Sequence, residues 1–403
     1  MSRAPVSEQA QSASAFIDSI GVNAHLSYTD TSYGNFARVE DELRSLGIRH
    51  IREGVHLGSS DYNNLLFGRW IELGKIGVRF DAVLDPREKL GTLTPALIER
   101  IEQLSGNTIE SFEGPNELDI NMPDWIGVDR DFQKNIFSSV ESASSQYRPQ
   151  VIAPSLAFVA KGKEFAGTLT GFDEGNLHPY PAGKMPSSVF PEQLDLARIV
   201  FGDKPIVITE SGYHNALNDH SDQPGVPERI AAKYIPRLFL ENFCEHIPRT
   251  YLYELFDEAP NPALTNNQLH WGLIRADGTE KPAYLSLKNL IHELADNADP
   301  APPLALAWTL SDSGPAIRHL LLQKSNGEFD LILWQEVSSY NTWIHREVRN
   351  DPANTTLILG NEARRVVLFE PVLQATPIQT YTNVTSVPVS IPDHPLVVEI
   401  EPK

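Results

Sequence analysis

The segment Phe112-Glu113-Gly114-Pro115-Asn116-Glu117-Leu118-Asp119 decides the fold of this chain. The run 109–112 that leads into it is short and partly apolar, as is typical of a β-strand. Gly114 and Pro115 then end regular structure, because glycine adopts unusual backbone angles and proline cannot donate to a ladder. Asn116 and Glu117 follow this break directly. A strand, a break and then an acid predict a carboxylic acid at the mouth of a barrel rather than inside it.

A second segment, Pro205-Ile206-Val207-Ile208-Thr209-Glu210-Ser211-Gly212-Tyr213, ends an apolar, β-branched run in another glutamate. Taken alone, Glu117 and Glu210 could each be an ordinary solvated acid in a loop. Two glutamates at strand ends, within a chain of alternating strands and helices, instead predict a pair of acids at one end of a barrel.

Strand candidates alternate with helical patterns up to about residue 294, which indicates parallel βαβ units. The expected strands lie at 20–26, 48–55, 78–84, 109–112, 151–154, 176–180, 205–210 and 250–256. Beyond them the pattern changes to short strands, with Asn326-Gly327 as a hairpin signal. The predicted fold class is α/β: a (β/α)8 TIM barrel followed by a small C-terminal all-β sandwich domain.

The proline-rich run 299–303 predicts a stiff linker at a domain boundary. We therefore expect a catalytic barrel over 18–298 and a β-sandwich over 304–403. The Ser/Ala/Gln-rich residues 1–17 are expected to form a flexible N-terminal segment.

Asn116-Glu117, followed much later by Ile208-Thr209-Glu210, resembles the signature of the retaining glycoside hydrolases of clan A, and loosely their family 39. The resemblance covers roughly residues 18–295. It implies a TIM barrel in which Glu117, after strand 4, is the general acid and base and Glu210, at the end of strand 7, is the nucleophile. Cleavage with retention needs two carboxyl groups about 5–5.5 Å apart in opposite protonation states. Strands 4 and 7 face each other across a barrel mouth, so this spacing is compatible with that distance.

The same resemblance implies roles for polar residues at other strand ends. Arg52 would hold the nucleophile ionised, Asn116 would bond the sugar 2-OH, and His178 with Tyr180 would contact the sugar and the nucleophile. Each has a structural alternative: a surface salt bridge for Arg52, a turn-forming amide for Asn116, and core packing for the His-Tyr pair.

Three further residues, Asn23, His25 and Asp85, lie at strand ends, where a barrel places its active site. The family's strand 8 often carries a tryptophan that forms the floor under the sugar, and this chain departs from that pattern at 251–256. We expect Tyr253 or the later Trp271 to take its place, since any aromatic face packs against the C–H face of a sugar.

Composition narrows the possible partners. A net charge of −20 over 403 residues argues against nucleic acid and against anionic membrane surfaces. The single Cys244 excludes an intrachain disulfide framework. No stretch approaches the ~18 apolar residues of a membrane helix, and the N-terminus has no signal-peptide core. Removal of a signal would place the protein outside the cell or in the periplasm, so the compartment stays open.

Motifs for other chemistries are missing from the sequence: there is no phosphate loop, no dinucleotide fingerprint, no serine elbow and no zinc-protease motif. The histidines are scattered rather than set at metal-ligand spacing, so the sequence predicts no cofactor and no metal. The expected partner is an oligosaccharide or polysaccharide, and the oligomeric state is left open. Two alternatives remain, a carbohydrate-binding barrel without catalysis and a transglycosidase with the same covalent intermediate.

Overall fold

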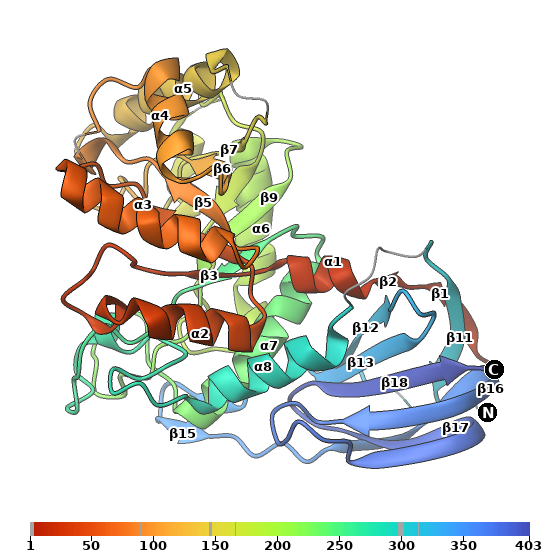
Figure 1. Cartoon of the computed structure of the whole chain (residues 1–403). Coiled ribbons are helices and arrows are strands. Elements are labelled where there is room, and N and C mark those ends of the chain that lie inside the picture. Colours follow the sequence, from red (N-terminus) through yellow and green to blue (C-terminus); the bar gives the residue numbers. More distant parts are fainter. Residues whose placement is uncertain (1–3, 89, 145–146, 166, 297–301, 313) are drawn as a thin grey trace.

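A computed structural model of the chain describes residues 4–88, 90–144, 147–165, 167–296, 302–312 and 314–403. It shows a helix-covered parallel barrel beside a large sheet (Figure 1). The barrel strands are ordered β7-β6-β5-β4-β3-β10-β9-β8, and every pair is parallel. A single bridge between Ile152 and Glu174 joins the two end strands. This confirms the predicted (β/α)8 barrel.

Six of the eight barrel strands are shorter than the sequence predicts, whereas β6 is one residue longer and β9 has the predicted length. They are β3 Ile20–Asn23, β4 His50–Gly54, β5 Arg79–Val83, β6 Ile109–Glu113, β7 Gln150–Ile152, β8 Gly175–Leu177, β9 Ile206–Ser211 and β10 Thr250–Leu252. The barrel helices are α2 Phe36–Leu46, α3 Ser60–Gly74, α4 Pro95–Leu104, α5 Trp125–Ser142, α6 Phe190–Phe201, α7 Glu228–Cys244 and α8 Pro282–Leu294. Between β7 and β8 the described residues form one helical segment, the 3-10 helix η3 Val159–Phe165.

Local sequence explains where the helices begin and end. The side chain of Thr94 accepts a hydrogen bond from the backbone N–H of Leu97, and Pro95 occupies the first turn of α4. Gly47 ends α2 in the left-handed region at φ 81°, which favours glycine. Helix α5 begins at Trp125, and the side chain of its N-cap residue Asp124 makes no capping hydrogen bond.

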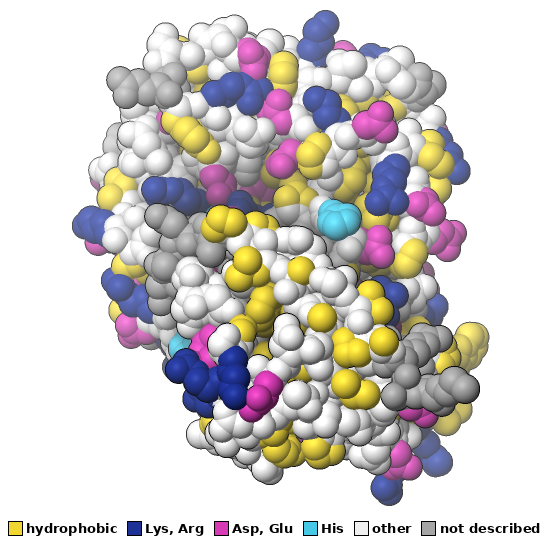
Figure 2. Space-filling model, turned by 90° about the vertical axis from the view of Figure 1, so that its right-hand side faces the viewer, with side chains coloured by type: hydrophobic (Ala, Val, Ile, Leu, Met, Phe, Trp, Pro, Cys, Tyr) yellow, Lys and Arg dark blue, Asp and Glu magenta, His cyan; other side chains and the backbone are white. Residues whose placement is uncertain are grey.

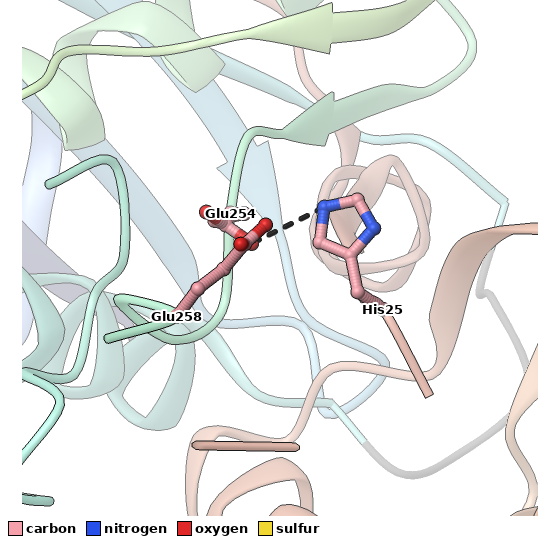
Figure 3. Close-up of side chains that lie close together, drawn as sticks. All are labelled: His25, Glu254 and Glu258. Atoms are coloured by element: carbon pink, nitrogen blue, oxygen red, sulfur yellow. Dashed lines mark ion pairs between the residues drawn. The ribbon is translucent and has the colours of Figure 1, made fainter. Parts of the chain in front are cut away.

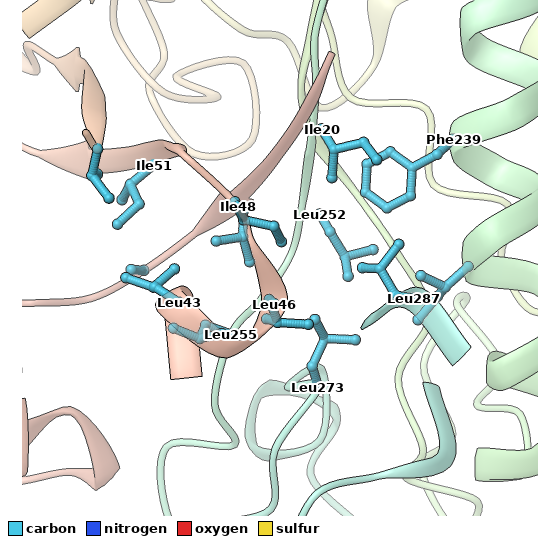
Figure 4. Close-up of a cluster of buried hydrophobic side chains, with 14 of the residues drawn as sticks. Ile20, Leu43, Leu46, Ile48, Ile51, Phe239, Leu252, Leu255, Leu273 and Leu287 are labelled. Carbon is cyan, nitrogen blue, oxygen red and sulfur yellow. The ribbon is translucent and has the colours of Figure 1, made fainter. Parts of the chain in front are cut away.

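Apolar side chains of the strands and helices meet in a large buried cluster around the outside of the barrel (Figure 4), and a second cluster covers β8 and α6. Ile20 of β3 and Leu252 of β10 pack near Phe239 of α7 and Leu287 of α8, all 1% exposed or less. Burying a side chain of this size contributes about 1.5–3 kcal/mol. The cluster thereby fixes the strands whose far ends carry the polar residues described below.

The C-terminal part is one eight-stranded sheet ordered β1-β11-β16-β18-β13-β12-β2, with β17 paired to β16. Its longer strands are β11 Ala305–Leu310, β12 Ile317–Gln323, β13 Phe329–Gln335, β16 Ala353–Phe369, β17 Gln379–Ile391 and β18 Leu396–Pro402, and a separate pair is formed by β14 Tyr340–Asn341 and β15 Arg346–Glu347. Strand β16 pairs with β11 through 357–359 and with β18 through 363–369, so one sheet encloses a core of its own. The predicted hairpin at Asn326-Gly327 joins β12 and β13, with Gly327 at φ 88°.

Within the N-terminal segment, which the sequence predicts to be flexible, residues 6–12 form two short strands of the C-terminal sheet. Strand β1 Val6–Gln9 pairs with β11, and β2 Gln11–Ser12 pairs with β12. Helix α1 Ala13–Asp18 then buries Phe16 against the barrel. The pairing partners lie hundreds of residues away along the chain, so local composition did not reveal these strands. Figure 1 shows the red strand β1 beside β11. Most of the predicted linker falls in 297–301, outside the described residues.

Helix α7 carries charged contacts between barrel and sheet. Arg237, which is 0% exposed, lies 2.6 Å from Glu336 and donates to the carbonyl oxygens of Val337 and Asp393. Lys233 contacts the Asp393 carboxylate at 2.8 Å. The two parts are therefore held together by buried, paired charges as well as by apolar contact.

The sheet side of the molecule carries hydrophobic, acidic and basic side chains interspersed (Figure 2). No helix in the described part of the chain is long and apolar enough to cross a membrane.

Candidate active site

Glu117 and Glu210 lie together at the carboxyl end of the barrel. Glu117 follows β6, and Glu210 is the next-to-last residue of β9. Oε1 of Glu117 is 2.7 Å from Nδ1 of His178, and the same nitrogen is 3.7 Å from Oε2 of Glu210. One oxygen of each glutamate and this nitrogen all lie within 4.8 Å of one another. The structure thus brings together the two acids that the sequence placed at strand ends.

The backbone before Glu117 passes tightly against the end of β7. A Cβ on Gly114 would lie 2.0 Å from Oε1 of Gln133 and 2.8 Å from the nitrogen of Pro154, so no larger residue fits there. Glu117 itself has φ 50°, and its N–H donates to the carbonyl oxygen of Ser155. The glycine and this left-handed turn carry the carboxylate of Glu117 out of the strand and into the mouth.

Arg52 of β4 joins several of these groups through its guanidinium. Its Nη1 donates to Glu210 at 2.5 Å and to Oδ1 of Asn23 at 3.0 Å. Its Nε and Nη2 donate to Glu113 at 2.6 and 2.8 Å, and Nη2 also reaches Oδ1 of Asn116 at 2.7 Å. A planar fork of this kind can hold two carboxylates at fixed angles, which a lysine cannot do.

Glu113 is the main residue of the site that sequence reasoning missed. It is 0% exposed, and besides Arg52 it accepts a hydrogen bond from Asn176 at 2.9 Å, while its Oε1 lies 3.2 Å from the Thr209 hydroxyl oxygen. A charged residue at the end of a buried strand was the available signal. Behind it lies Asp81, where burial and the neighbouring Glu113 raise the pKa well above its usual value. This shift favours the protonated form of Asp81.

Glu210 is kept ionised by its surroundings. Burial raises its pKa, but the charges of His178 and Arg52 and a 2.7 Å hydrogen bond from the Tyr180 hydroxyl outweigh burial, so that the pKa is lowered. Burial lowers the pKa of His178, whereas Glu210 and Glu117 raise it, and the net pKa is raised. Glu210 therefore carries a negative charge beside the hydrogen-bonded pair of His178 and Glu117.

The side-chain amide of Asn116 uses its oxygen in hydrogen bonds within the protein, whereas its nitrogen is available within the described ranges. Its Oδ1 accepts from Arg52 and from Ser155 at 3.0 Å, and its backbone N–H donates to Asp85 at 3.1 Å. The structure gives its Nδ2 no hydrogen-bond partner within the described ranges. Asn116 can therefore offer one N–H donor to a ligand beside Glu117.

Aromatic side chains form another part of the mouth. Trp271 lies with its ring 5.0 Å from that of Tyr180 and 6.0 Å from that of Tyr253, which follows β10. His25 contacts the Tyr253 hydroxyl through Nε2 at 3.2 Å. The indole Nε1 of Trp271 is buried and finds no partner among the described residues. Both aromatic candidates for the missing strand 8 tryptophan thus lie beside the acids.

Two predicted residues lie behind the site rather than facing it. Asn23 is 2% exposed, and its Nδ2 donates to the carbonyl oxygen of Thr209 at 3.0 Å. Asp85 is 5% exposed, binds Arg87 through both oxygens, and reaches the site only through the backbone of Asn116. Their polar atoms are used within the protein, so they support other residues.

A hollow of about 800 Å³ lies at the other end of the barrel, lined by residues such as Arg79 and Ile109, which begin β5 and β6. Active sites of TIM barrels form at the carboxyl ends of the strands. The hollow is therefore far from the chemistry, despite its size.

No protein-family model and no curated protein matches the chain. Solved structures do. A monomeric β-xylosidase from Caulobacter crescentus CB15 superposes with a TM-score of 0.62 at 13% identity, covering 100% of this chain and 98% of its own. A glucosidase from Croceicoccus marinus gives 0.63 at 10% identity, covering 91% and 92%. A family GH39 β-xylosidase from Caulobacter crescentus gives 0.60 at 12% identity, covering 100% and 98%.

These similarities extend over the barrel and the C-terminal sheet alike. They establish that the chain has the fold of clan A glycoside hydrolases, loosely like family 39, as the sequence resemblance implied.

Proposed function

We propose that this protein is a retaining glycoside hydrolase that cleaves O-glycosidic bonds of oligosaccharides or polysaccharides. One observation carries the proposal: carboxylate oxygens from β6 and β9 come within 4.8 Å of each other at the barrel mouth. Retaining enzymes hold their two carboxyl groups about 5–5.5 Å apart, whereas inverting enzymes need about 6.5–9.5 Å to admit a water. The narrower spacing favours direct attack by one carboxylate on the sugar.

In the first step Glu210 attacks the anomeric carbon, and the glycosidic C–O bond breaks as Glu117 transfers its proton to the leaving oxygen. Arg52 and Tyr180 both hydrogen-bond Glu210, at 2.5 and 2.7 Å. They hold one carboxylate rotamer in place for the attack and keep it ionised until the covalent bond forms. Forming that bond removes the negative charge of Glu210.

The proton of the acid can be traced through His178. The Thr209 hydroxyl lies 2.7 Å from Oδ1 of Asn176, to which it donates, so it accepts from Nε2–H of His178 at 2.8 Å. Nδ1 of His178, 2.7 Å from Glu117, then either accepts the proton of a carboxylic acid or donates to a carboxylate. The pair His178–Glu117 holds one mobile proton in both cases, which is what a general acid requires.

In the second step a water attacks the glycosyl-enzyme, and Glu117 takes its proton, which restores both glutamates. The available Nδ2 donor of Asn116 would bond the sugar 2-OH, a contact that strengthens in such transition states. Tyr253 and Trp271 would pack against the C–H face of the ring. His25 would lie at the edge of the same subsite, where it contacts Tyr253.

The first substrates to test are p-nitrophenyl β-D-xyloside and β-D-glucoside, because similar folds belong to a β-xylosidase and a glucosidase. An α-linked L-pentoside has equivalent geometry and should be included. Proton NMR of the fresh product should first show the anomer of the substrate, β from the β-glycosides and α from the α-L-pentoside. An initial anomer of the opposite configuration would contradict retention, transfer products in place of free sugar would indicate a transglycosidase, and no turnover of any glycoside would leave a carbohydrate-binding barrel.

A further inference from the structure

A second group of ligand-type side chains lies beside the catalytic pair, at the ends of β3 and β10 (Figure 3). It consists of His25, Glu254 and Glu258, which we call the His25 cluster. Nε2 of His25 and one oxygen of each carboxylate lie within 4.8 Å of one another. Nε2 is 3.3 Å from Oε2 of Glu254, the contact drawn in Figure 3. The three side chains come from two separate loops and converge on one point.

The polar atoms of this cluster are not all paired within the described part of the chain. Glu254 is 0% exposed; its Oε2 accepts from Tyr33 at 2.9 Å, but its buried Oε1 has no hydrogen-bond partner there. The buried Lys281 is held by Asp257 at 2.8 Å. A buried carboxylate oxygen without a partner is costly, so a cation or a proton must accompany it.

The ligand geometry is fixed in advance. The ring of His25 stacks on Tyr28 at 4.7 Å and meets the edges of Tyr33 and Tyr253, each at 5.6 Å. The hydroxyl of Tyr33 orients the Glu254 carboxylate, as hydrogen bonds behind metal ligands commonly do. A pre-oriented imidazole beside two acids is a favourable donor set for a metal ion.

We propose that the His25 cluster binds one divalent cation, zinc or manganese in preference to calcium or magnesium. One imidazole and two carboxylates suit metals of intermediate softness, whereas calcium and magnesium prefer oxygen ligands alone. A tetrahedral ion with bonds of about 2.0–2.2 Å places its ligand atoms roughly 3.4 Å apart, close to the 3.3 Å between His25 and Glu254. The ion neutralises the cluster and cross-links the loops after β3 and β10. The sequence showed no metal-ligand spacing, because these ligands are brought together only by barrel closure.

Binding is measured by titrating the full chain, first stripped with a chelator, with Zn²⁺ and separately with Mn²⁺ in a calorimeter, alongside thermal melting. One ion per chain and a raised Tm are expected. Glu258→Gln removes a half-buried ligand and should weaken binding by roughly 100-fold or more. Asp30→Asn is the matched control: it removes one exposed charge that raises the pKa of Glu258 without lying in the cluster, and it should change affinity only a few-fold.

Glu117, His178 and Glu210 form a competing trio of possible ligands, so Glu117→Gln completes the test. Retained binding in Glu117→Gln together with loss in Glu258→Gln supports the proposal. The reverse pattern would place the ion at the catalytic pair and overturn it. Absence of binding in the unmodified chain would also overturn it and show that a proton neutralises the cluster. Since the readout is binding, these outcomes do not depend on hydrolytic activity.

Discussion

Arg52 hydrogen-bonds residues on both sides of the candidate site, Glu210 on one side and Asn116 on the other. Its three nitrogens contact Glu113, Glu210, Asn23 and Asn116. Each charge-assisted hydrogen bond of this type contributes about 1.5–3 kcal/mol. The arginine therefore positions both the attacking carboxylate and the amide beside the acid.

Arg52→Lys should lower kcat/KM by roughly 100-fold or more, since a lysine can replace at most one or two of these bonds. The measurement is steady-state hydrolysis of the best aryl glycoside. Arg44→Lys, in an exposed pair with Glu40 on α2, is the control and should leave the rate unchanged. Near-normal turnover of Arg52→Lys would leave the arginine with a purely structural role.

The two glutamates make different predictions with one reagent. Glu210→Ala should lower hydrolysis by at least about 10⁴-fold. Added azide should then restore some turnover by attacking from the face that Glu210 occupied, giving a glycosyl azide of inverted configuration.

Glu117→Ala should still form the covalent intermediate from substrates with good leaving groups, because these need little protonation. The intermediate should accumulate and be visible by mass spectrometry of the intact protein. Azide should rescue this variant with retained configuration. Exchanged stereochemistry would reverse the two roles, and full activity of either variant would remove that residue from the mechanism.

At the scale of single elements, the segment after β6 is the critical one. Gly114 has no room for a side chain because Gln133 and the backbone of Pro154 lie within 2.0 and 2.8 Å of the position of a Cβ. Shifting this turn moves Glu117 and Asn116 together, since both follow within three residues. The close packing around Gly114 therefore determines where the carboxylate of Glu117 lies.

Gly114→Ala should destabilise the fold by about 1–3 kcal/mol, as overpacking commonly does, and should lower kcat more than it changes KM. Gly68→Ala is the control within helix α3, where an added Cβ meets nothing within 4 Å. That variant should be stabilised by up to about 1 kcal/mol, because alanine favours a helix over glycine. Chemical denaturation and kinetics measured on both variants test the claim, and equal behaviour of the two would contradict it.

At the scale of the whole molecule, three acidic side chains lie close together where helix α8 of the barrel meets the C-terminal sheet. Asp330 of β13 is 0% exposed, with neither carboxylate oxygen hydrogen-bonded among the described residues. It lies with Glu293 of α8 and Glu399 of β18, their carboxylate oxygens within 4.8 Å. Burial raises the pKa of Asp330 to about 7, with Lys324 opposing and the two glutamates adding to the shift. Stability of the joint should therefore depend on pH.

In an unfolded chain Asp330 would titrate near about 3.9. Because its folded pKa is higher, the folded state retains a proton that the unfolded state releases, and this contribution is full below about pH 4 and is lost as the pH rises to about 7. Asp330→Asn removes the titration, so its Tm relative to the unmodified chain should rise between pH 5 and pH 8. The exposed Asp312→Asn should show no such trend, and parallel curves for Asp330→Asn would refute the prediction.

The sequence alone determined the barrel, the order of its strands and the two acids at strand ends. Hydrophobic alternation and the glycine-proline break are local patterns, and strands of a parallel barrel all point their carboxyl ends the same way. Glu117 and Glu210 were therefore predictable as neighbours from the positions of their strands.

Only the tertiary structure decided the remaining polar contacts around them. Glu113 became the partner of Arg52, residues 6–12 became part of the distant C-terminal sheet, and His25 met Glu254 and Glu258. Each of these contacts joins residues far apart in the chain, and no local propensity specifies such a pair. They form because closing the barrel and burying both cores fix the backbone first, and polar side chains then hydrogen-bond the partners that this packing brings within reach.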